Sequence, residues 1–287
     1  MKKLKRVYVE ITNVCNLSCS FCPKTKKETR SLTINEFEHI VKKVEKHTDH
    51  LYFHVMGEPT LHPNLLEFLK TANAHNLFVN LTTNGTQIKK IAPVLLECLP
   101  RKVSFSLHSY EGNNNKISLE EYLKPIVEFA KVATQKNIIV EFRLWNLKNN
   151  ENKNLLNGQI LHFIVNELNL DKTLLNVLHE KSGVTLFPNC YLGFDNEFMW
   201  PDETLNLNLS SVYCLALKNQ IAILSDGTVV PCCLDYNASI TLGNIFNESL
   251  EDILNSDLAK KMLLEFKNRT PVCKLCQNCN YAKQKFM

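Results

Sequence analysis

Apolar and polar residues follow two different periods along the first two-thirds of the chain. Short apolar runs rich in β-branched and aromatic residues are typical of buried strands. They alternate with segments whose apolar residues recur every three or four positions, as on one face of a helix. Ser118 followed by Glu121 is the pattern of a helix-capping box. The expected strands are residues 7–11, 51–55, 77–81, 103–108, 138–146 and, weakly, 184–187, and the expected helices are residues 32–46, 64–75, 87–99, 118–136 and 159–168.

These repeated strand–helix units determine the expected fold class. Because parallel strands joined by helices need right-handed crossovers, the pattern predicts a parallel sheet covered by helices. About six such units fit into residues 1–187, which indicates an α/β fold of the partial TIM-like (β/α)6 barrel type.

The pattern changes after residue 187. Residues 188–209 are mostly irregular, and we expect them to form a linker and lid between two domains. Farther on, two short apolar strands flank Asp226 and Gly227, which is a strong hairpin signature because both turn residues tolerate positive φ. Residues 249–266 have the period of an amphipathic helix. The sequence therefore predicts a small α+β domain over residues 210–287.

Composition excludes several classes of protein. Of the 287 residues, 45% are hydrophobic and 22% are charged, which is ordinary for a globular chain. The net charge is +4 with scattered lysines, and this favours a solvated surface over a nucleic-acid-binding one. No apolar run reaches the roughly 18 residues of a membrane span, and no signal peptide is visible, so we expect a cytoplasmic protein without membrane contact.

The 11 cysteines are the residues that most need an explanation. A reducing cytosol disfavours disulfides, so their grouping matters more than their number. Cys98 and Cys190 stand alone, and we interpret them as ordinary buried thiols. The first group is Cys15, Cys19 and Cys22, and the second is Cys214, Cys232, Cys233, Cys273, Cys276 and Cys279.

The first group lies in a loop that follows the first strand, at the end where ligands collect in α/β folds. Three thiolates from one short loop can hold three corners of a [4Fe–4S] cluster and leave the fourth iron open. A structural zinc site has four protein ligands, so a zinc knuckle here would need one more ligand from another part of the chain.

The spacing Cys15-x3-Cys19-x2-Cys22, with the aromatic Phe21 before the last cysteine, resembles the radical S-adenosylmethionine (radical SAM) superfamily. The resemblance implies that the open iron binds the amino and carboxylate groups of SAM. It also implies that the reduced cluster splits SAM into methionine and a 5′-deoxyadenosyl radical, which takes a hydrogen atom from the substrate. An electron donor such as flavodoxin or ferredoxin would then be a partner.

Two further motifs match this family. Gly57-Glu58-Pro59 follows the second strand and resembles the motif whose backbone meets the SAM amino group, for which carbonyls and a carboxylate are suitable acceptors. Thr83 and Asn84 end the third strand, where family members seat the SAM ribose or carboxylate. Both stretches also have the composition of simple turns.

Polar residues on the fourth and fifth strands are further candidates for SAM or substrate contact. Ser106 and His108 alternate on the expected strand 103–108, so they share one face. Arg143 lies on the next strand, and arginine is a natural carboxylate partner. The alternative is that these residues lie at the rim of the barrel and form hydrogen bonds only within the protein. An error of one residue in the strand register would place the other face of the strand, with other residues, toward the barrel interior.

The second cysteine group also resembles a known pattern. Twelve residues separate Cys214 from Gly227, and four separate Gly227 from Cys232, as at the start of the SPASM and twitch extensions of radical SAM enzymes. The cysteines are too few for two auxiliary clusters, so one auxiliary [4Fe–4S] cluster is expected, and a zinc ribbon is the alternative. Cys233 and Cys273 compete with the expected ligands, which are Cys214, Cys232, Cys276 and Cys279.

The sequence therefore predicts a radical SAM enzyme that abstracts hydrogen from an unidentified peptide or small molecule. Only six residues precede the first strand, so we expect no fused leader-binding domain at the N-terminus. This weakens, without excluding, the case for a peptide substrate that is captured by its leader. The alternatives are an iron–sulfur electron carrier and a zinc-binding nucleic-acid module.

We expect loops 108–116 and 188–209 to shape substrate choice. No catalytic base is identified, and the candidates for taking a substrate proton are Asp195, Glu197, Asp202 and Asp235.

Overall fold

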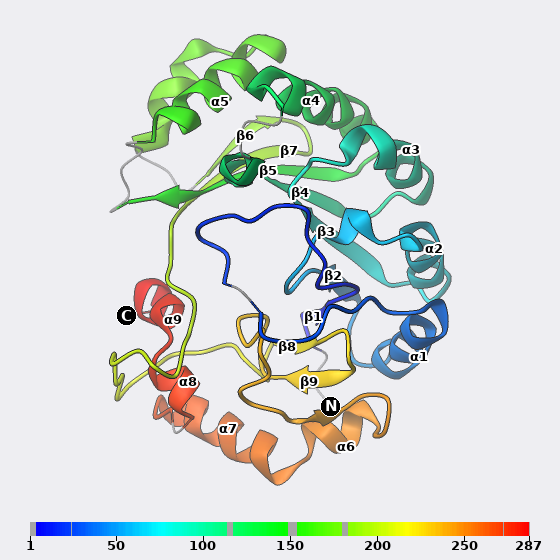
Figure 1. Cartoon of the computed structure of the whole chain (residues 1–287), viewed down its shortest axis with the longest axis vertical. Coiled ribbons are helices and arrows are strands. Elements are labelled where there is room, and N and C mark those ends of the chain that lie inside the picture. Colours follow the sequence, from blue (N-terminus) through cyan, green and yellow to red (C-terminus); the bar gives the residue numbers. More distant parts are fainter. Residues whose placement is uncertain are drawn as a thin grey trace. The chain divides into compact units, whose positions relative to one another are not determined.

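The computed structural model describes residues 4–23, 25–113, 117–148, 154–179, 183–271 and 273–286 (Figure 1). The chain forms two compact units. The first contains residues 1–14, 23–79 and 198–287, and the second contains residues 15–22 and 80–197. Of the loop expected at 108–116, residues 114–116 lie outside the described residues. Within the described ranges, no helix is long and apolar enough to cross a membrane.

The first unit is built on a mainly parallel sheet. Strand β1 (Arg6–Val9) pairs in parallel with β2 (His50–Phe53) on one side and with β8 (Gln220–Ile223) on the other. The expected hairpin is confirmed, because β8 turns at Asp226 and Gly227 into the antiparallel strand β9 (Thr228–Val230). A two-residue strand, β10 (Gly243–Asn244), follows β9. The C-terminal hairpin thus extends the sheet that the first strand begins.

Helices α1 (Ile34–Val44) and α2 (Leu65–Ala74) cover this sheet through aromatic contacts. The Phe37 ring stacks on Phe68 at 4.3 Å and meets Phe53 edge-on at 5.4 Å. Near the C-terminus, the single helix expected over 249–266 is two helices, because the Ser256 hydroxyl accepts from the Ala259 N–H and starts a new helix. The remaining helices of this unit are α6 (Leu250–Leu254), α7 (Asp257–Asn268), α8 (Lys274–Gln277) and α9 (Asn280–Phe286).

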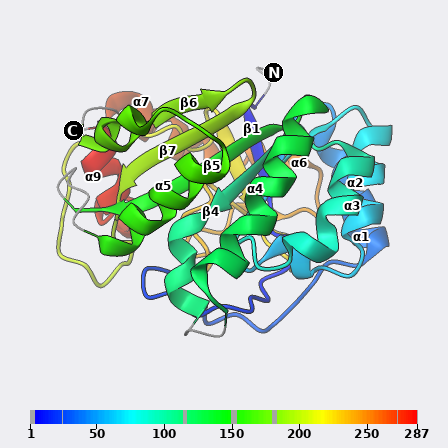
Figure 2. The same ribbon diagram turned by 90° about the horizontal axis from the view of Figure 1, so that it is seen from above.

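The second unit continues from β3 (Phe78–Thr83), whose last four residues pair in parallel with β4 (Lys102–Ser106). Strand β4 pairs with β5 (Ile139–Leu147), β5 with β7 (Cys190–Asn196), and β7 with the antiparallel strand β6 (Gly183–Phe187). Figure 2 shows α4 (Leu119–Gln135) beside β4, where Phe129 meets Phe105 at 5.8 Å. The other elements are α3 (Ile88–Cys98), the 3₁₀ turn η2 (Leu107–Asn113), α5 (Leu155–Glu167) and the 3₁₀ turn η3 (Lys172–His179).

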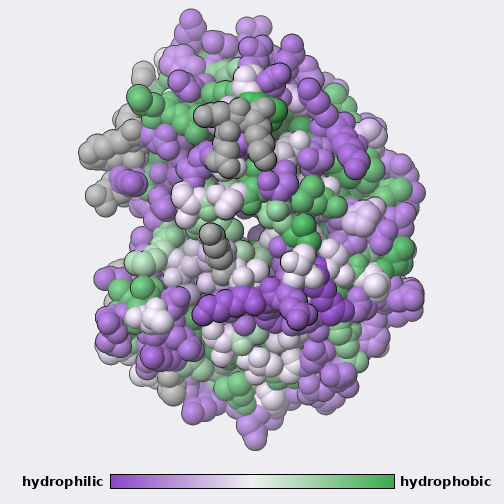
Figure 3. Space-filling view, in the orientation of Figure 1, coloured by the Kyte–Doolittle hydropathy of each residue, from purple (hydrophilic) through white to green (hydrophobic). Residues whose placement is uncertain are grey.

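The expected fold class, an α/β partial barrel with a smaller C-terminal part, is confirmed. Within residues 188–209, expected to be mostly irregular, the structure contains an unexpected strand, β7. Cys190, Leu192 and Phe194 alternate inward along this strand, but Gly193 and the polar residues at its end weaken the pattern. The domain boundaries expected at residues 187 and 209 stay a prediction. Hydrophilic residues predominate on the face seen in Figure 3.

Candidate functional site

The three N-terminal thiols lie in one short loop of the second unit. Cys15 and Cys22 are exposed, Cys19 is partly buried, and a turn closes between the Cys22 N–H and the Cys19 carbonyl oxygen at 3.3 Å. Burial raises the pKa of Cys19 to about 12 and that of Cys22 to about 11, and the neighbouring thiols add to both shifts. Thiolates held this close repel one another, so the set fits a cationic iron–sulfur group that would neutralise them.

The 3₁₀ turn η2 holds this loop from one side. The Cys19 thiol donates to the Ser109 carbonyl oxygen at 3.7 Å, and the Ser20 hydroxyl donates to Glu111 Oε1 at 2.7 Å. Gly112 lies so close that a β-carbon there would stand 2.9 Å from Cys19 Sγ. Sequence reasoning missed Gly112, although a glycine in the expected substrate loop was visible.

Asn84 holds the same loop from the end of β3. Its side-chain N–H donates to Asn16 Oδ1 at 2.9 Å and lies 3.9 Å from Cys15 Sγ. Its Oδ1 accepts from the Thr86 N–H, while the Thr83 hydroxyl accepts from the Gly85 N–H at 3.0 Å. Thr83 and Asn84 therefore build the turn, and Asn84 also contacts the cysteine loop.

His108 has a different place from the one expected. The chain leaves β4 after Ser106, so His108 lies in η2 and does not alternate with Ser106 on one strand. Its ring packs against Phe21 at 4.7 Å, and its Nδ1 lies 3.1 Å from the Arg143 carbonyl oxygen. Burial lowers its pKa to about 4, so the ring is neutral at neutral pH. A neutral, buried ring of this kind braces the cysteine loop.

Arg143 lies opposite Ser106 in the register of β4 and β5. Its Nε donates to Glu141 Oε2 at 2.6 Å, and its Nη2 donates to Ser104 Oγ at 2.9 Å. Burial alone would raise the pKa of Glu141, but Arg143 and Lys102 outweigh it and lower the pKa to about 2. An ionised Glu141 thus fixes the guanidinium plane of Arg143. Sequence reasoning missed Glu141, which shares the polar face of β5 two residues before Arg143.

Gly57, Glu58 and Pro59 belong to the first unit. Gly57 has φ +77°, and a β-carbon on it would collide with the Thr12 carbonyl oxygen. The Glu58 N–H donates to the Val14 carbonyl oxygen at 2.7 Å, so the motif is tied to the residue that precedes Cys15. The Glu58 carboxylate accepts from the Thr60 N–H and hydroxyl and thereby caps the 3₁₀ turn η1 (Pro59–Leu61). The expected contact between the backbone of this motif and the SAM amino group stays a prediction.

Four of the C-terminal thiols are close neighbours in the first unit. Burial raises the pKa of Cys232 and of Cys276 well above the ordinary value. Neighbouring thiols add to both shifts, namely Cys233, Cys214 and Cys276 for Cys232, and Cys214, Cys273 and Cys279 for Cys276. Burial also raises the pKa of Cys279 to about 11, again with a contribution from Cys214. Cys214 and Cys279 pack against one apolar cluster that includes Leu209. These thiols therefore act electrostatically on one another, and the choice of Cys214, Cys232, Cys276 and Cys279 as ligands stays a prediction.

Asn278 brings two distant segments together to form this group. It is 1% exposed, and its Oδ1 accepts from the Leu207 N–H at 2.9 Å and the Asn208 N–H at 3.3 Å. The Leu209 N–H donates to the Gln277 carbonyl oxygen at 2.9 Å. The segment that leads to Cys214 is thus fastened to the turn between Cys276 and Cys279. Sequence reasoning missed this role of Asn278.

The two competing cysteines, Cys233 and Cys273, act on the same thiols and also have contacts of their own. Cys233 packs with Ala222 and Val230 and forms a side-chain hydrogen bond with Tyr8. Burial raises the pKa of Cys273, followed by the charge of Glu265. Among the described residues, no three His, Cys, Asp or Glu side chains converge on one metal-ion position. The thiolates of a cubane cluster bind different irons and need not converge.

Backbone N–H groups point at three of the expected ligand sulfurs. The Leu17 N–H donates to Cys15 Sγ at 3.5 Å, the Ala216 N–H to Cys214 Sγ at 3.4 Å, and the Ala282 N–H to Cys279 Sγ at 3.4 Å. Such N–H···S bonds favour thiolate ligands and help to set the reduction potential of a bound cluster. The donor set therefore fits an iron–sulfur group at both ends of the chain.

Two of the four carboxylates considered as bases have structural roles. Asp235 is 2% exposed and accepts from the Ser239 and Ile240 N–H groups, each at 2.8 Å. Asp202 accepts from the Thr204 N–H and hydroxyl. Both carboxylates shape turns. The roles of Asp195 and Glu197 as bases stay predictions.

Two family models match separate parts of the chain. A family model described as the radical SAM superfamily matches residues 9–156. A second, SPASM, described as an iron–sulfur cluster-binding domain, matches residues 214–280.

Individual relatives match at low identity over most of their length. An S-adenosyl-L-methionine-dependent 2-deoxy-scyllo-inosamine dehydrogenase from Niallia circulans is 23% identical, over 96% of this chain and 94% of that protein. A cysteine-type anaerobic sulfatase-maturating enzyme from Clostridium novyi is 24% identical, over 98% and 86%. The solved structure of BtrN in complex with AdoMet and 2-DOIA has the same fold, with a TM-score of 0.58 at 20% identity over 98% of this chain and 94% of that one.

Proposed function

Since this chain belongs to the radical SAM superfamily, we propose that it cleaves SAM with a cluster held by Cys15, Cys19 and Cys22 and then oxidises a small polar molecule. It is a radical SAM enzyme whose cofactors are a [4Fe–4S] cluster, SAM and an auxiliary iron–sulfur cluster. When bound, the first cluster and SAM supply the 5′-deoxyadenosyl radical that takes a hydrogen atom from the substrate. The observation that carries the proposal is the three-thiol loop, which η2 and Asn84 hold in place.

The residues around this loop would divide the remaining tasks. Phe21 and His108 brace the loop by packing their rings together. The backbone of Gly57, Glu58 and Pro59 would accept from the SAM ammonium, because its turn is already closed by the Glu58 side chain. Thr83 and Asn84 would seat the ribose or carboxylate. Ser106 and Arg143 would bind SAM or substrate, with Arg143 oriented by Glu141.

The auxiliary cluster would be held by Cys214, Cys232, Cys276 and Cys279. Oxidation of an alcohol to a ketone removes two electrons and two protons, and abstraction of a hydrogen atom removes one of each. A second redox centre in the same chain can take the other electron, whereas the proton needs a base that we do not assign. The single four-cysteine set is sufficient for this task.

A small polar substrate is favoured over a peptide by two observations. The dehydrogenase relative, whose name gives a small molecule as its substrate, matches over 94% of its own length. In addition, β4 and β5 present Ser104, Glu141 and Arg143 as a connected polar network, which suits hydroxyl or amine groups. Peptide modification is the second candidate, because the sulfatase-maturating relative covers 98% of this chain.

The test begins with iron and sulfide analysis of anaerobically reconstituted protein. About eight irons with matching sulfide are expected for two [4Fe–4S] clusters. Dithionite and SAM should then yield 5′-deoxyadenosine, and Cys22→Ala should abolish this yield whereas Cys98→Ala should retain it. Protein that binds iron but does not cleave SAM would support the alternative of an electron carrier. Protein that binds zinc alone would support the alternative of a zinc-binding module.

Substrate class is tested separately. 2-Deoxy-scyllo-inosamine and a cysteine-type sulfatase peptide are the two probes, each deuterated at the carbon that loses hydrogen. Deuterium transfer into 5′-deoxyadenosine from the first probe supports a small-molecule dehydrogenase, and transfer from the peptide alone overturns that choice. Flavodoxin and ferredoxin, the proposed electron donors, replace dithionite in a parallel assay. A cytoplasmic location stays part of the proposal.

A further inference from the structure

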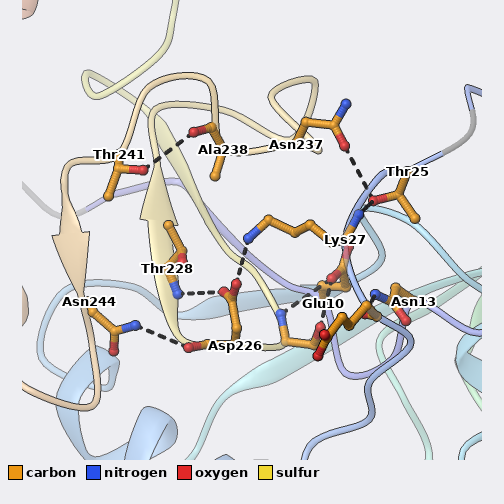
Figure 4. Close-up of polar contacts among 12 residues, drawn as sticks. Glu10, Asn13, Thr25, Lys27, Asp226, Thr228, Asn237, Ala238, Thr241 and Asn244 are labelled. Atoms are coloured by element: carbon orange, nitrogen blue, oxygen red, sulfur yellow. Dashed lines mark hydrogen bonds and ion pairs between the residues drawn. The ribbon is translucent and has the colours of Figure 1, made fainter.

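The stretch directly after the first cysteine motif is fastened to the C-terminal part of the chain (Figure 4). The Thr25 hydroxyl donates to Asn237 Oδ1 at 3.3 Å, and the Lys26 N–H donates to the same oxygen at 3.2 Å. The Lys27 ammonium pairs with Asp226 Oδ2 at 2.5 Å. Two residues from the C-terminal part thus hold three successive residues that begin three positions after Cys22.

The strand end before the cysteine motif is held by the same hairpin turn. Glu10 is 2% exposed, and its Oε1 accepts from the Ser225 hydroxyl at 2.9 Å and the Ser225 N–H at 3.3 Å. Its Oε2 accepts from the Met56 N–H at 3.1 Å. Ser225 and Asp226 are neighbours in the chain. One turn therefore contacts the segments on both sides of the cysteine loop.

These two segments are also joined to each other. The Asn13 side-chain N–H donates to the Glu28 carbonyl oxygen at 2.8 Å, and Asn13 Oδ1 accepts from the Arg30 N–H at 2.8 Å. The Asn13 N–H donates to the Arg30 carbonyl oxygen at 3.1 Å. Residues 10–13 and 25–30 thus form a closed stem, and the loop Cys15–Cys22 lies between its two arms in the sequence.

The turn that contacts the stem is itself rigid. Gly227 has φ +83°, and a β-carbon there would collide with the Phe246 ring. The Asn244 side chain donates to the Asp226 carbonyl oxygen at 3.0 Å, and Asp226 Oδ1 accepts from the Thr228 N–H at 3.0 Å. The position of the Asp226 carboxylate is therefore set by the C-terminal core rather than by Lys27.

Asn237 is placed by a second element of the same part. Asp235 fixes its turn by accepting from the Ser239 and Ile240 N–H groups. Cys232, an expected ligand of the auxiliary cluster, lies between Asp226 and Asn237 in the sequence. The segment that would carry this ligand thus also carries one of the two contacts to the stem.

We propose that Asp226 and Asn237 are positioning residues that hold the stem of the Cys15–Cys22 loop in place. Through them, the auxiliary iron–sulfur part of the chain controls the order of the loop that binds the first cluster. This inference rests on the proposed function only in assigning a cluster to that loop. A loop whose ends are fixed loses less conformational freedom when its thiols bind the cluster, so the clamp favours a single ligand geometry.

The test compares three variants by hydrogen exchange of reconstituted holoprotein. Asp226→Asn removes the negative charge that pairs with Lys27, Asn237→Ala removes the amide oxygen that accepts from Thr25 and Lys26, and Lys27→Asp combined with Asp226→Lys reverses the ion pair. Glu38→Gln is the matched control, because it removes the surface ion pair of Lys42 on α1. Amide exchange in residues 13–31 should rise about five- to tenfold in the two single variants, remain unchanged in α4, and return toward the wild-type rate in the charge reversal.

A second readout separates positioning from general stability. The dissociation constant of SAM, measured by equilibrium dialysis, should rise about three- to tenfold in Asp226→Asn and Asn237→Ala while bound iron stays unchanged. Unchanged exchange in residues 13–31, or an equal rise in α4, would overturn the inference. A wild-type protein that binds clusters but does not cleave SAM would instead refute the proposed function and leave the exchange result valid.

Discussion

Gly112 and Cys19 are packed so closely that a β-carbon on Gly112 would lie 2.9 Å from the Cys19 sulfur and 3.2 Å from its backbone nitrogen. The two residues are 93 positions apart in the sequence, and the contact joins η2 to the cysteine loop. Any side chain at position 112 must therefore displace a proposed cluster ligand or the turn itself.

The first prediction follows from that contact. Gly112→Ala should lower the SAM cleavage rate at least about tenfold, because a displaced ligand misplaces the reacting groups. Gly158→Ala is the matched control, since nothing lies within 4 Å of its β-carbon position in α5. A rate for Gly112→Ala equal to that of the control would show that the turn yields without moving Cys19.

The second prediction distinguishes two adjacent cysteines. Cys232→Ser should remove the auxiliary cluster and lower the bound iron from about eight to about four per chain. Cys233→Ser should keep all the iron, because Cys233 packs against the apolar cluster around Tyr8. Iron analysis after identical anaerobic reconstitution is the measurement. The reverse outcome would exchange the two assignments.

The third prediction concerns Gly57. Its φ of +77° is strained for any other residue, and an added β-carbon would also collide with the Thr12 carbonyl oxygen. Gly57→Ala should therefore lower the free energy of unfolding by about 2 kcal/mol and weaken SAM binding. Urea unfolding and equilibrium dialysis measure the two effects. A variant as stable as wild type would contradict this view of the turn.

The fourth prediction is a pH dependence from Glu141. Burial would raise its pKa, but Arg143 and Lys102 lower it to about 2, below the ordinary value of 4.5. The ionised group therefore stabilises the fold above about pH 4.5, and this contribution is lost as the pH falls from about 4.5 toward 2.

Glu141→Gln should accordingly reduce the unfolding free energy by roughly 2 kcal/mol at pH 7 and pH 5, and by less below pH 4.5. Chemical denaturation at each pH gives the difference from wild type. Glu28→Gln serves as the control, because its carboxylate is not part of this network. A difference that stays constant down to pH 3.5 would show that Glu141 acts through packing alone.

The sequence alone determined the fold class, most of the strands and helices, and the residues able to bind clusters. These features depend on local patterns: apolar periodicity sets each element, and closely spaced cysteines in one loop define a donor set wherever the loop lies. Ser118 and Thr33 start their helices as capping residues in the way that short-range hydrogen bonding requires.

The local sequence pattern did not predict the structure of segments whose conformation depends on contacts with distant parts of the chain. Strand β7 is held by pairing with β5 and β6, which compensates for the glycine in its middle. His108 looked like a continuation of β4, but its burial against Phe21 and its contact with the Arg143 carbonyl oxygen belong to η2. Such contacts join residues distant in sequence, and no local period records them.

Only the tertiary structure decided how the candidate site is held together. Gly112 against Cys19, Asn278 against the segment before Cys214, and Asp226 against Lys27 are contacts between residues at least 70 positions apart. Each contact depends on where two chain segments meet after folding. The identity of a single glycine, asparagine or aspartate does not predict which residue it will contact. The sequence therefore predicts the cluster ligands, whereas the folded chain determines which residues hold those cysteines in position.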